Sequence, residues 1–278
     1  MTKPQTIQIF LPEGEARGIR IAEITARIVN AVCIPRNKIQ DAQKRKEVNR
    51  VGVYFLFGEG EEDVKPVVYI GEAEDVHHRL KQHNRNKDFW NTAIVVTSKD
   101  ANLNKACAKF LEWYCYNKAN EIKRYRLENN AEPTKSAISE ADEAYSLDFF
   151  ENMSVLLSVL GFPVFNPLKK AKKQEQFICK GKKALAHGEY TDDGFLVLAE
   201  SKANIDESRS IQEWIMRIRR KLIDTGMLKQ IGDVYVFNED SLFNTPSAAA
   251  ATVLGRSANG WTEWKTKDGK TLDELKRK

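Results

Sequence analysis

Two short apolar runs decide the fold, Gly52-Val53-Tyr54-Phe55-Leu56-Phe57 and Val67-Val68-Tyr69-Ile70-Gly71. Both are rich in β-branched and aromatic residues, which favour β-strands. The acidic segment between them contains glycine and proline, residues that are typical of loops. We therefore predict two antiparallel strands, over residues 51–57 and 67–71, joined by a loop of about nine residues.

Alternation along each predicted strand places a tyrosine and a glycine on the same face. On the first strand that face carries Tyr54 and Gly52, and on the second it carries Tyr69 and Gly71. A glycine leaves room beside a phenol, so a phosphate group can approach closely. We therefore predict that Gly52 and Gly71 border a substrate phosphate.

The segment that follows is basic and favours a helix. Asp75 can cap a helix that runs to about His83. Residues 76–87 contain four cations, three histidines and no acid; the cations are Arg79, Lys81, Arg85 and Lys87. The i,i+4 spacing puts Arg79 and His83 on one helix face. Arg79 and Lys81 are candidate phosphate ligands, whereas His77 and His78 are expected on the surface.

The remaining elements follow one another in mixed order. We predict strands over residues 6–11, 93–97, 194–200 and 233–237, and helices over residues 102–120, 139–160, 210–225 and 246–254. Residues 19–32 fit either a strand or a helix. The mixed order, without strict βαβ units, favours an α+β fold. At about 150 residues per domain, 278 residues correspond to two domains.

The charge distribution suggests where the domains meet. The net charge is +5, and residues 169–183 contain seven lysines and one acid. We interpret residues 169–183 as a basic linker between domains 48–168 and 184–278. Residues 1–47 contain too little apolar sequence for a core of their own, so we expect them to pack on the first domain.

Cysteine usage and hydropathy favour a cytoplasmic protein. The four cysteines, at positions 33, 107, 115 and 179, lack zinc-site spacing, and a chain of this length does not need a disulfide scaffold. No stretch approaches the roughly 20 apolar residues that span a membrane. The N-terminal residues lack the apolar core of a signal peptide, so classical export is not expected.

The quoted residues resemble the motif of the GIY-YIG nuclease family. The resemblance is carried by Gly52-Val53-Tyr54, Tyr69-Ile70-Gly71, Arg79 and His83, and it covers about residues 48–168. It implies a small antiparallel sheet flanked by helices, and a metal-dependent DNA endonuclease. The family's metal-binding glutamate matches Glu112, which would hold Mg²⁺ or Mn²⁺ through oxygen ligation. Val53 replaces the family's middle isoleucine, and the loop before Tyr69 is longer than usual.

The resemblance also implies a role for each matching residue. Arg79 would bind the phosphate oxygens, and Tyr54 would act as the general base toward the attacking water. Tyr69 would orient the water or phosphate. His83 would relay the proton or serve as a second candidate base.

Two assignments are open on the residues alone. A helical wheel places Glu112 nearly opposite the apolar residues Leu103, Cys107, Phe110 and Tyr114, so periodicity predicts a surface glutamate. The DNA-contacting asparagine of the family has three candidates here, Asn120, Asn117 and the weaker Asn166.

Residues 184–278 resemble the domain of unknown function that often follows GIY-YIG nucleases and, less closely, the RAMA domain of restriction enzymes and adenine methylases. The resemblance implies a domain that binds DNA or reads modified DNA. The helix over residues 210–225 carries Arg217, Arg219, Arg220 and Lys221. We predict phosphate contacts for Arg217 and Arg220. Trp261 and Trp264 fit either base stacking or a hydrophobic core.

The sequence thus predicts a DNA endonuclease that acts in restriction, defence or DNA repair. Two alternatives are a non-catalytic reader of modified DNA on a nuclease scaffold and a subunit of a defence system that needs a protein partner. RNA stays open as a substrate because nothing in the sequence reads a 2′-hydroxyl. The oligomeric state is open as well.

Overall fold

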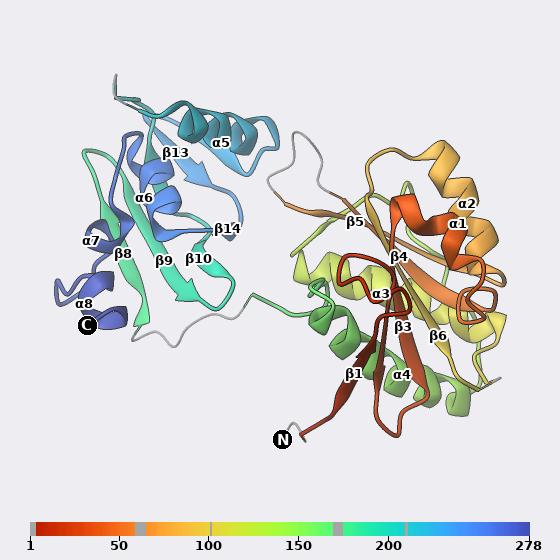
Figure 1. Ribbon diagram of the computed structural model, residues 1–278. Helices are drawn as coiled ribbons and strands as arrows, with labels where there is room; N and C mark the ends of the chain where they lie inside the picture. The colour runs from red at the N-terminus through yellow and green to blue at the C-terminus, as the bar shows by residue number, and fades with distance from the viewer. Residues whose placement is uncertain (1–3, 59–64, 101, 169–174, 209–210) are drawn as a thin grey trace. The chain divides into compact units, whose positions relative to one another are not determined.

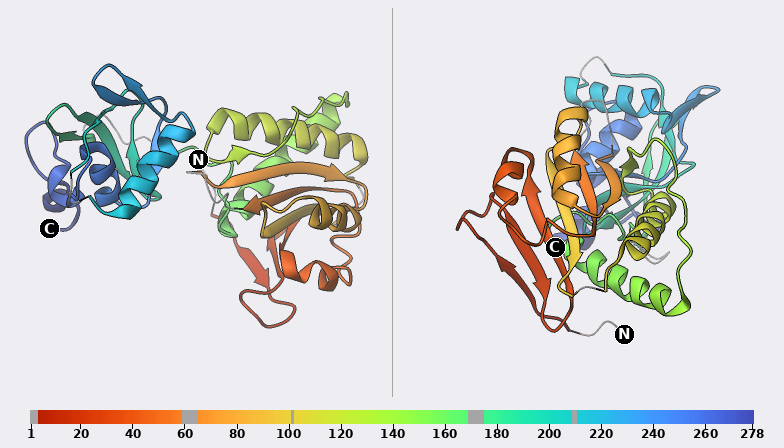
Figure 2. Two further views of the ribbon diagram at one scale, coloured as in Figure 1. Left: turned by 90° about the horizontal axis from the view of Figure 1, so that it is seen from above. Right: turned by 90° about the vertical axis from the view of Figure 1, so that its right-hand side faces the viewer.

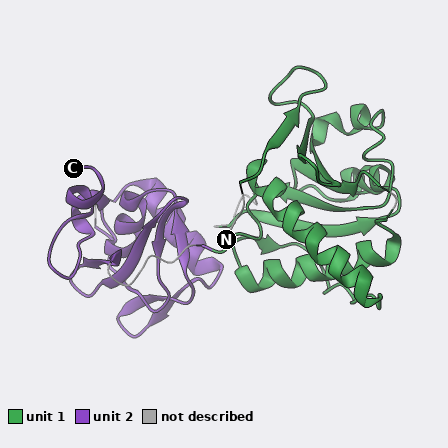
Figure 3. Cartoon of the chain, turned by 90° about the horizontal axis from the view of Figure 1, so that it is seen from below, with its two compact units in different colours: residues 1–167 green, residues 168–278 purple. Residues whose placement is uncertain are grey.

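The computed structural model describes residues 4–58, 65–100, 102–168, 175–208 and 211–278 (Figure 1). The chain divides into two compact units, residues 1–167 and 168–278 (Figure 3). Most of the loop predicted between the two tyrosine strands, and the lysines from 169 to 173, lie outside the described residues.

A mixed sheet forms the centre of the first unit. Its order, within the described residues, is β1-β2-β3-β6-β4-β5-β7, and all neighbours are antiparallel except the β5 and β7 pair. The strands are β1 (Ile7–Phe10), β2 (Arg20–Ile24), β3 (Val29–Pro35), β4 (Gly52–Gly58), β5 (Val67–Ala73), β6 (Thr92–Ser98) and β7 (Arg126–Leu127).

The two strands predicted from the opening motif are confirmed. Strands β4 and β5 pair in antiparallel register, with Tyr54 opposite Gly71 and Leu56 opposite Tyr69. Tyr54 and Leu56 belong to one buried cluster and Tyr69 packs against it, so the predicted shared face is confirmed as well.

Helices cover both faces of this sheet (Figure 2, left). Helices α3 (Lys105–Ile122) and α4 (Glu140–Val159) bury one face, and α1 (Ile39–Ala42) and α2 (Val76–Asn86) bury the other. Each long helix begins with a side-chain cap, because the oxygens of Asp75, Asn104 and Ser139 accept hydrogen bonds from backbone N–H groups of the first turn.

The N-terminal segment is an integral part of the sheet. Residues 19–32, which the sequence left open, form most of the β2–β3 hairpin. Strand β3 pairs with β6 from Val29 opposite Ser98 to Pro35 opposite Thr92. Residues 1–47 therefore add three strands, and the sheet is larger than the small sheet that the resemblance implied.

The second unit has a sheet of its own. Its order within the described residues is β12-β13-β11-β9-β10-β14, and β8 pairs with β9. The strands are β8 (Phe177–Lys180), β9 (Leu185–Thr191), β10 (Gly194–Val197), β11 (Lys202–Asn204), β12 (Leu228–Ile231), β13 (Val234–Phe237) and β14 (Ser241–Phe243). The predicted linker over residues 169–183 is therefore too long at its C-terminal end, because β8 already belongs to this sheet.

Helix α6 (Pro246–Leu254) lies at the centre of this unit and is almost entirely buried. The other helices are α5 (Glu213–Asp224), α7 (Gly260–Glu263) and α8 (Leu272–Lys276). The fold is thus α+β in both units, as predicted. No helix among the described residues is both long enough and apolar enough to cross a membrane.

Candidate active site

A hollow of about 340 Å³ lies at the edge of the first unit's sheet where β5, α2 and α3 meet. Four of the five predicted catalytic residues line it, and they are Tyr69, Arg79, His83 and Glu112. Lys87, Asn129, Asn130, Ala131 and Pro133 complete the lining. The folded chain therefore brings together residues that are far apart in the sequence.

Tyr54 lies directly behind this lining. Its side chain is 1% exposed, and its hydroxyl group lies 2.8 Å from Nε2 of His83. The ring centroids of Tyr54 and Tyr69 are 6.2 Å apart, and that of His83 is 5.0 Å from Tyr69. Tyr54 thus reaches the hollow through His83 and Tyr69.

The electrostatic environment keeps His83 neutral. Burial, together with the nearby positive charges of Arg79 and Lys87, lowers the pKa of His83 to about 4. Burial and the neighbouring Tyr69 raise the pKa of the Tyr54 phenol, although Arg79 opposes this effect. At neutral pH, therefore, the Tyr54 hydroxyl is protonated and the imidazole is neutral, and the tautomer of His83 decides which of the two donates the hydrogen bond.

The two basic side chains of the hollow leave charge available for an anion. Arg79 is exposed and donates a hydrogen bond to Oε1 of Gln82, at 2.8 Å. Interaction with the Tyr54 hydroxyl raises the pKa of Arg79. Lys87 Nζ lies 4.7 Å from the centroid of the Tyr69 ring. Arg79 and Lys87 show no ion pair with an acidic residue in the described part of the chain.

Glu112 is part of the site and is not a simple surface residue. It shares a helix face with Ala108, Cys115 and Ala119, which are all buried. The prediction from the helical wheel is therefore wrong, because these small residues form the face on which α3 approaches the sheet. The charge of Lys109, three residues earlier on α3, acts on Glu112, whereas Lys105 pairs with Glu74 at 3.2 Å.

Burial, with repulsion from Glu72 as the second cause, raises the pKa of Glu112 to about 7. When the pKa of a carboxyl group is higher in the folded than in the unfolded protein, the folded protein becomes less stable as the pH rises from the unfolded pKa through the folded pKa. The cost is therefore complete above pH 7, where Glu112 must be charged in the folded protein.

Replacing Glu112 by glutamine removes that cost. Because the carboxylate is partly solvated, we expect Glu112→Gln to raise Tm by only about 2–4 °C at pH 8, and by less at pH 5. Thermal unfolding at both pH values, without divalent metal, measures the effect. Glu151→Gln, at an exposed position on α4, serves as control. If both variants change Tm by the same amount at each pH, the raised pKa of Glu112 does not affect stability.

The donor set at the hollow fits a hard divalent cation. Glu112 supplies a carboxylate beside open space, which is the chemistry that Mg²⁺ and Mn²⁺ prefer. The buried Oε2 of the adjacent Glu72 has no hydrogen-bond partner in the described part of the chain. Among the described residues, no three acidic, histidine or cysteine side chains form a metal-binding group. A cation here would therefore complete its shell with water and substrate oxygens.

The two glycines predicted to border a substrate phosphate are both buried, and neither lines the hollow. A Cβ atom at Gly71 would lie 2.4 Å from the Tyr54 hydroxyl oxygen. A Cβ atom at Gly52 would lie 2.6 Å from the carbonyl oxygen of Val96. Gly71 thus makes room for the Tyr54 phenol itself, and Gly52 allows close packing of β4 against β6.

Three other sequence assignments change with the structure. Lys81 is half-buried and is not among the residues that line the hollow. Asn120 is exposed two helical turns beyond Glu112 and does not line it either. His77 is 4% exposed, not a surface residue, since its Nε2 bonds to the carbonyl of Ile39 at 3.1 Å.

The sequence analysis did not assign Lys87, Asn129 or Asn130 to the site, although all three line the hollow. Lys87 continues the i,i+4 spacing of Arg79 and His83, so this signal was available. Asn129 bonds to both the N–H and the carbonyl of Ile70, at 3.0 and 2.7 Å, and so extends the edge of β5. No local sequence pattern predicts this contact. Of the asparagine candidates from the sequence, Asn117 bonds to Trp113 and Asn166 bonds to Ser158.

In the second unit the basic helix α5 has one buried arginine. Arg217 and Arg220 are exposed, as phosphate contacts require. Arg219 is 1% exposed and donates hydrogen bonds to the carboxylate of Glu207 and to the carbonyls of Thr252 and Asn204. Arg219 therefore has a structural role and does not belong to the exposed basic face.

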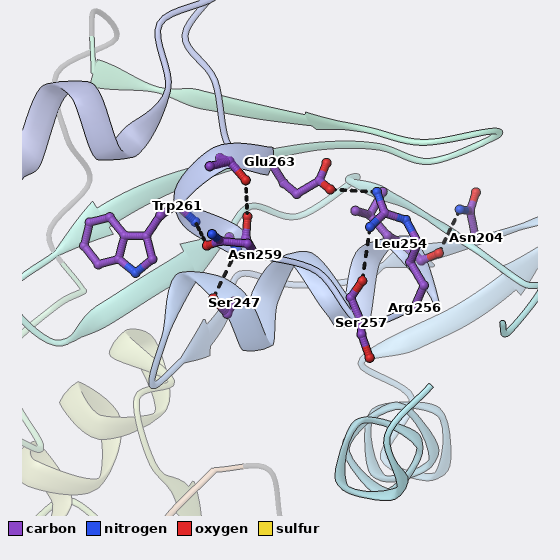
Figure 4. A network of polar contacts seen from close by, with 10 residues as sticks. Asn204, Ser247, Leu254, Arg256, Ser257, Asn259, Trp261 and Glu263 are labelled. Atoms are coloured by element: carbon purple, nitrogen blue, oxygen red, sulfur yellow. Dashed lines mark hydrogen bonds and ion pairs between the residues drawn. The ribbon is translucent and has the colours of Figure 1, made fainter. Parts of the chain in front are cut away.

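The segment after α6 is fixed by a network of polar contacts (Figure 4). Asn259 accepts from the Trp261 N–H at 3.1 Å, the Gly260 N–H donates to Ser247, and Arg256 pairs with Glu263 at 2.7 Å. Trp264 is fully buried and its Nε1 donates to the carbonyl of Pro246, so a stacking role is excluded for it. Arg277 lies 3.5 Å above the ring of the partly exposed Trp261.

The second unit is similar to a known protein family. A family described as a domain of unknown function, DUF4357, matches residues 177–276. The match runs from the first residue of β8 to the last residue of α8, and it begins before the predicted boundary at residue 184. No curated protein and no solved structure matches the chain.

Proposed function

We propose that the first unit is a metal-dependent DNA endonuclease of the GIY-YIG type, and that the second unit is an accessory DNA-binding domain. One observation carries the proposal. Tyr69, Arg79, His83 and Glu112 line one hollow, and Tyr54 lies behind it against His83, so that four separate elements contribute to the site. Two phenols, a neutral imidazole, a guanidinium and a carboxylate are the groups that phosphodiester hydrolysis uses.

The basic side chains bind the scissile phosphate in this proposal. Arg79 donates to the non-bridging oxygens, on which charge builds up in the transition state. Lys87, above the Tyr69 ring, adds a second positive charge at the same end of the hollow. Tyr69 lines the hollow beside these two cations, where its hydroxyl orients the phosphate or the attacking water.

The Tyr54 and His83 pair moves the proton. The Tyr54 hydroxyl and Nε2 of the neutral His83 share a hydrogen bond, and in the tautomer that carries its proton on Nδ1 the imidazole accepts. Tyr54 takes a proton from the attacking water while its own proton passes to Nε2 of His83, so the phenol need not ionise beforehand. His83, which lines the hollow, is the second candidate for accepting the proton directly.

Glu112 is the residue that would hold Mg²⁺ or Mn²⁺. When bound, the cation would supply positive charge that stabilises the leaving oxygen. Glu112 and Arg79 line the same hollow, so the guanidinium can bind a phosphate beside the carboxylate that would hold the cation.

The test is a cleavage assay with the purified full-length chain and Mg²⁺ or Mn²⁺. Plasmid, single-stranded DNA, methylated DNA and RNA serve as substrates. We expect metal-dependent cleavage of DNA and a loss of about 10²- to 10⁴-fold in Tyr54→Phe, which removes only the hydroxyl that transfers the proton. Tyr145→Phe, whose hydroxyl bonds to Ser98 away from the hollow, is the matched control.

His83→Ala separates the two routes for the proton. Loss in both Tyr54→Phe and His83→Ala supports the coupled pair, whereas loss in His83→Ala alone makes His83 the base. Wild-type cleavage by both variants contradicts the assigned site.

A second candidate function is a DNA-binding protein that does not cleave by itself. The burial of the Tyr54 hydroxyl and its raised pKa favour this reading, since a base must meet water. In it, the exposed Arg217 and Arg220 of α5 contact phosphates, and a protein partner supplies or activates the catalysis. DNA binding without cleavage of any substrate would support it.

A further inference from the structure

A second carboxylate lies beside Glu112. Glu72 follows Gly71 on β5 and lies on the face of the strand that carries Val68 and Ile70. That face is covered by α3, the helix that carries Glu112. Repulsion between the Glu72 and Glu112 carboxylates contributes to the raised pKa of Glu112.

In the described part of the chain, no positive charge or hydrogen-bond donor fully neutralises the two carboxylates. Oε2 of Glu72 is buried and has no hydrogen-bond partner. Lys105, on the first turn of α3, pairs instead with Glu74 at 3.2 Å. Lys109, on the same helix, is exposed. A buried carboxylate oxygen without a partner is costly, and a bound cation removes that cost.

We propose that Glu72 is a second protein ligand of the divalent cation that Glu112 would hold. The inference rests on the proposed function, which needs such a cation, and it adds a ligand that the sequence motif did not indicate. Two carboxylates from β5 and α3 bind a hard cation such as Mg²⁺ or Mn²⁺ more tightly than one carboxylate does. They also fix the cation to the strand that carries Tyr69.

The test measures Mn²⁺ binding by the full-length chain without DNA, by titration calorimetry and by the electron paramagnetic resonance signal of free Mn²⁺. We expect Glu72→Gln to weaken binding by about 10- to 100-fold or more. Glu112→Gln should weaken it at least as much. Glu74→Gln, which removes an exposed carboxylate two residues away, should leave the dissociation constant unchanged.

The outcomes distinguish this inference from the proposed function. Wild-type affinity in Glu72→Gln together with lost binding in Glu112→Gln would overturn the role of Glu72 and leave the endonuclease proposal standing. Absence of Mn²⁺ binding in the wild-type protein would overturn the two-carboxylate site, whereas the cleavage assay decides the endonuclease proposal. Weaker binding in Glu72→Gln than in Glu74→Gln, with both variants folded by circular dichroism, supports the second ligand.

Discussion

Replacing Glu112 by alanine is expected to lower the rate of metal-dependent DNA cleavage by about 10³-fold or more. Metal ions contribute several kcal/mol of charge stabilisation in such reactions, and each 1.36 kcal/mol corresponds to a factor of ten. In the proposed mechanism Glu112 is the metal ligand, and it lines the same hollow as Arg79 and His83, so its replacement would remove that ligand and leave those two side chains in place. Rates with saturating DNA and increasing Mg²⁺ give the measurement.

Glu121→Ala on the same helix is the matched control, because Glu121 is exposed and pairs with Lys118 one turn away. DNA binding should persist in Glu112→Ala, since Arg79 and Lys87 are unchanged. Full cleavage by this variant at low Mg²⁺ would show that the carboxylate is not the ligand.

Replacing Arg219 by alanine is expected to destabilise the second unit by about 3–5 kcal/mol, because each buried carbonyl left without a donor costs about 1–3 kcal/mol. The change leaves two buried carbonyls, those of Asn204 and Thr252, without their donor, and it leaves Glu207 without its partner. Differential scanning calorimetry of the full chain, together with hydrogen exchange in α6, measures the loss.

Arg220→Ala tests the specificity of this effect, because Arg220 is the exposed neighbour on the same helix and its change should stay within about 0.5 kcal/mol. Arg219→Lys should be intermediate, since lysine keeps the charge and loses the planar set of donors. Equal unfolding of the Arg219→Ala and Arg220→Ala proteins would mean that the buried contacts contribute nothing.

Local sequence patterns predicted the elements that have strong signals of their own. Strands β4 and β5, the capped helix α2, and helices α4 and α6 follow from alternation, capping residues and terminators. The pairing of β3 with β6 could not be predicted, because it joins segments far apart in the chain. Strand β8 was hidden by the lysines on either side, whose charge favoured a linker.

The sequence predicted the site residues whose type and spacing indicate their chemistry. It did not predict how deeply individual side chains are buried. Arg79 and His83 follow from helical spacing. Glu112 was placed on the wrong side of α3, because alanine and cysteine are weak apolar signals although they allow the closest approach to a sheet. Arg219 was grouped with Arg217 and Arg220, because a charged residue in a basic stretch gives no sign that it is buried.

The pairing of β3 with β6 also determines when the first unit can fold during synthesis. Strand β3 is almost wholly buried in the finished sheet, yet its partner follows roughly 60 residues later. At about 5–20 residues per second, an apolar hairpin therefore waits several seconds for the strand that covers its edge. The tyrosine strands β4 and β5 are made during this interval. Assembly of the hollow thus depends on a late, non-local contact, and the growing chain is most exposed to aggregation before β6 emerges.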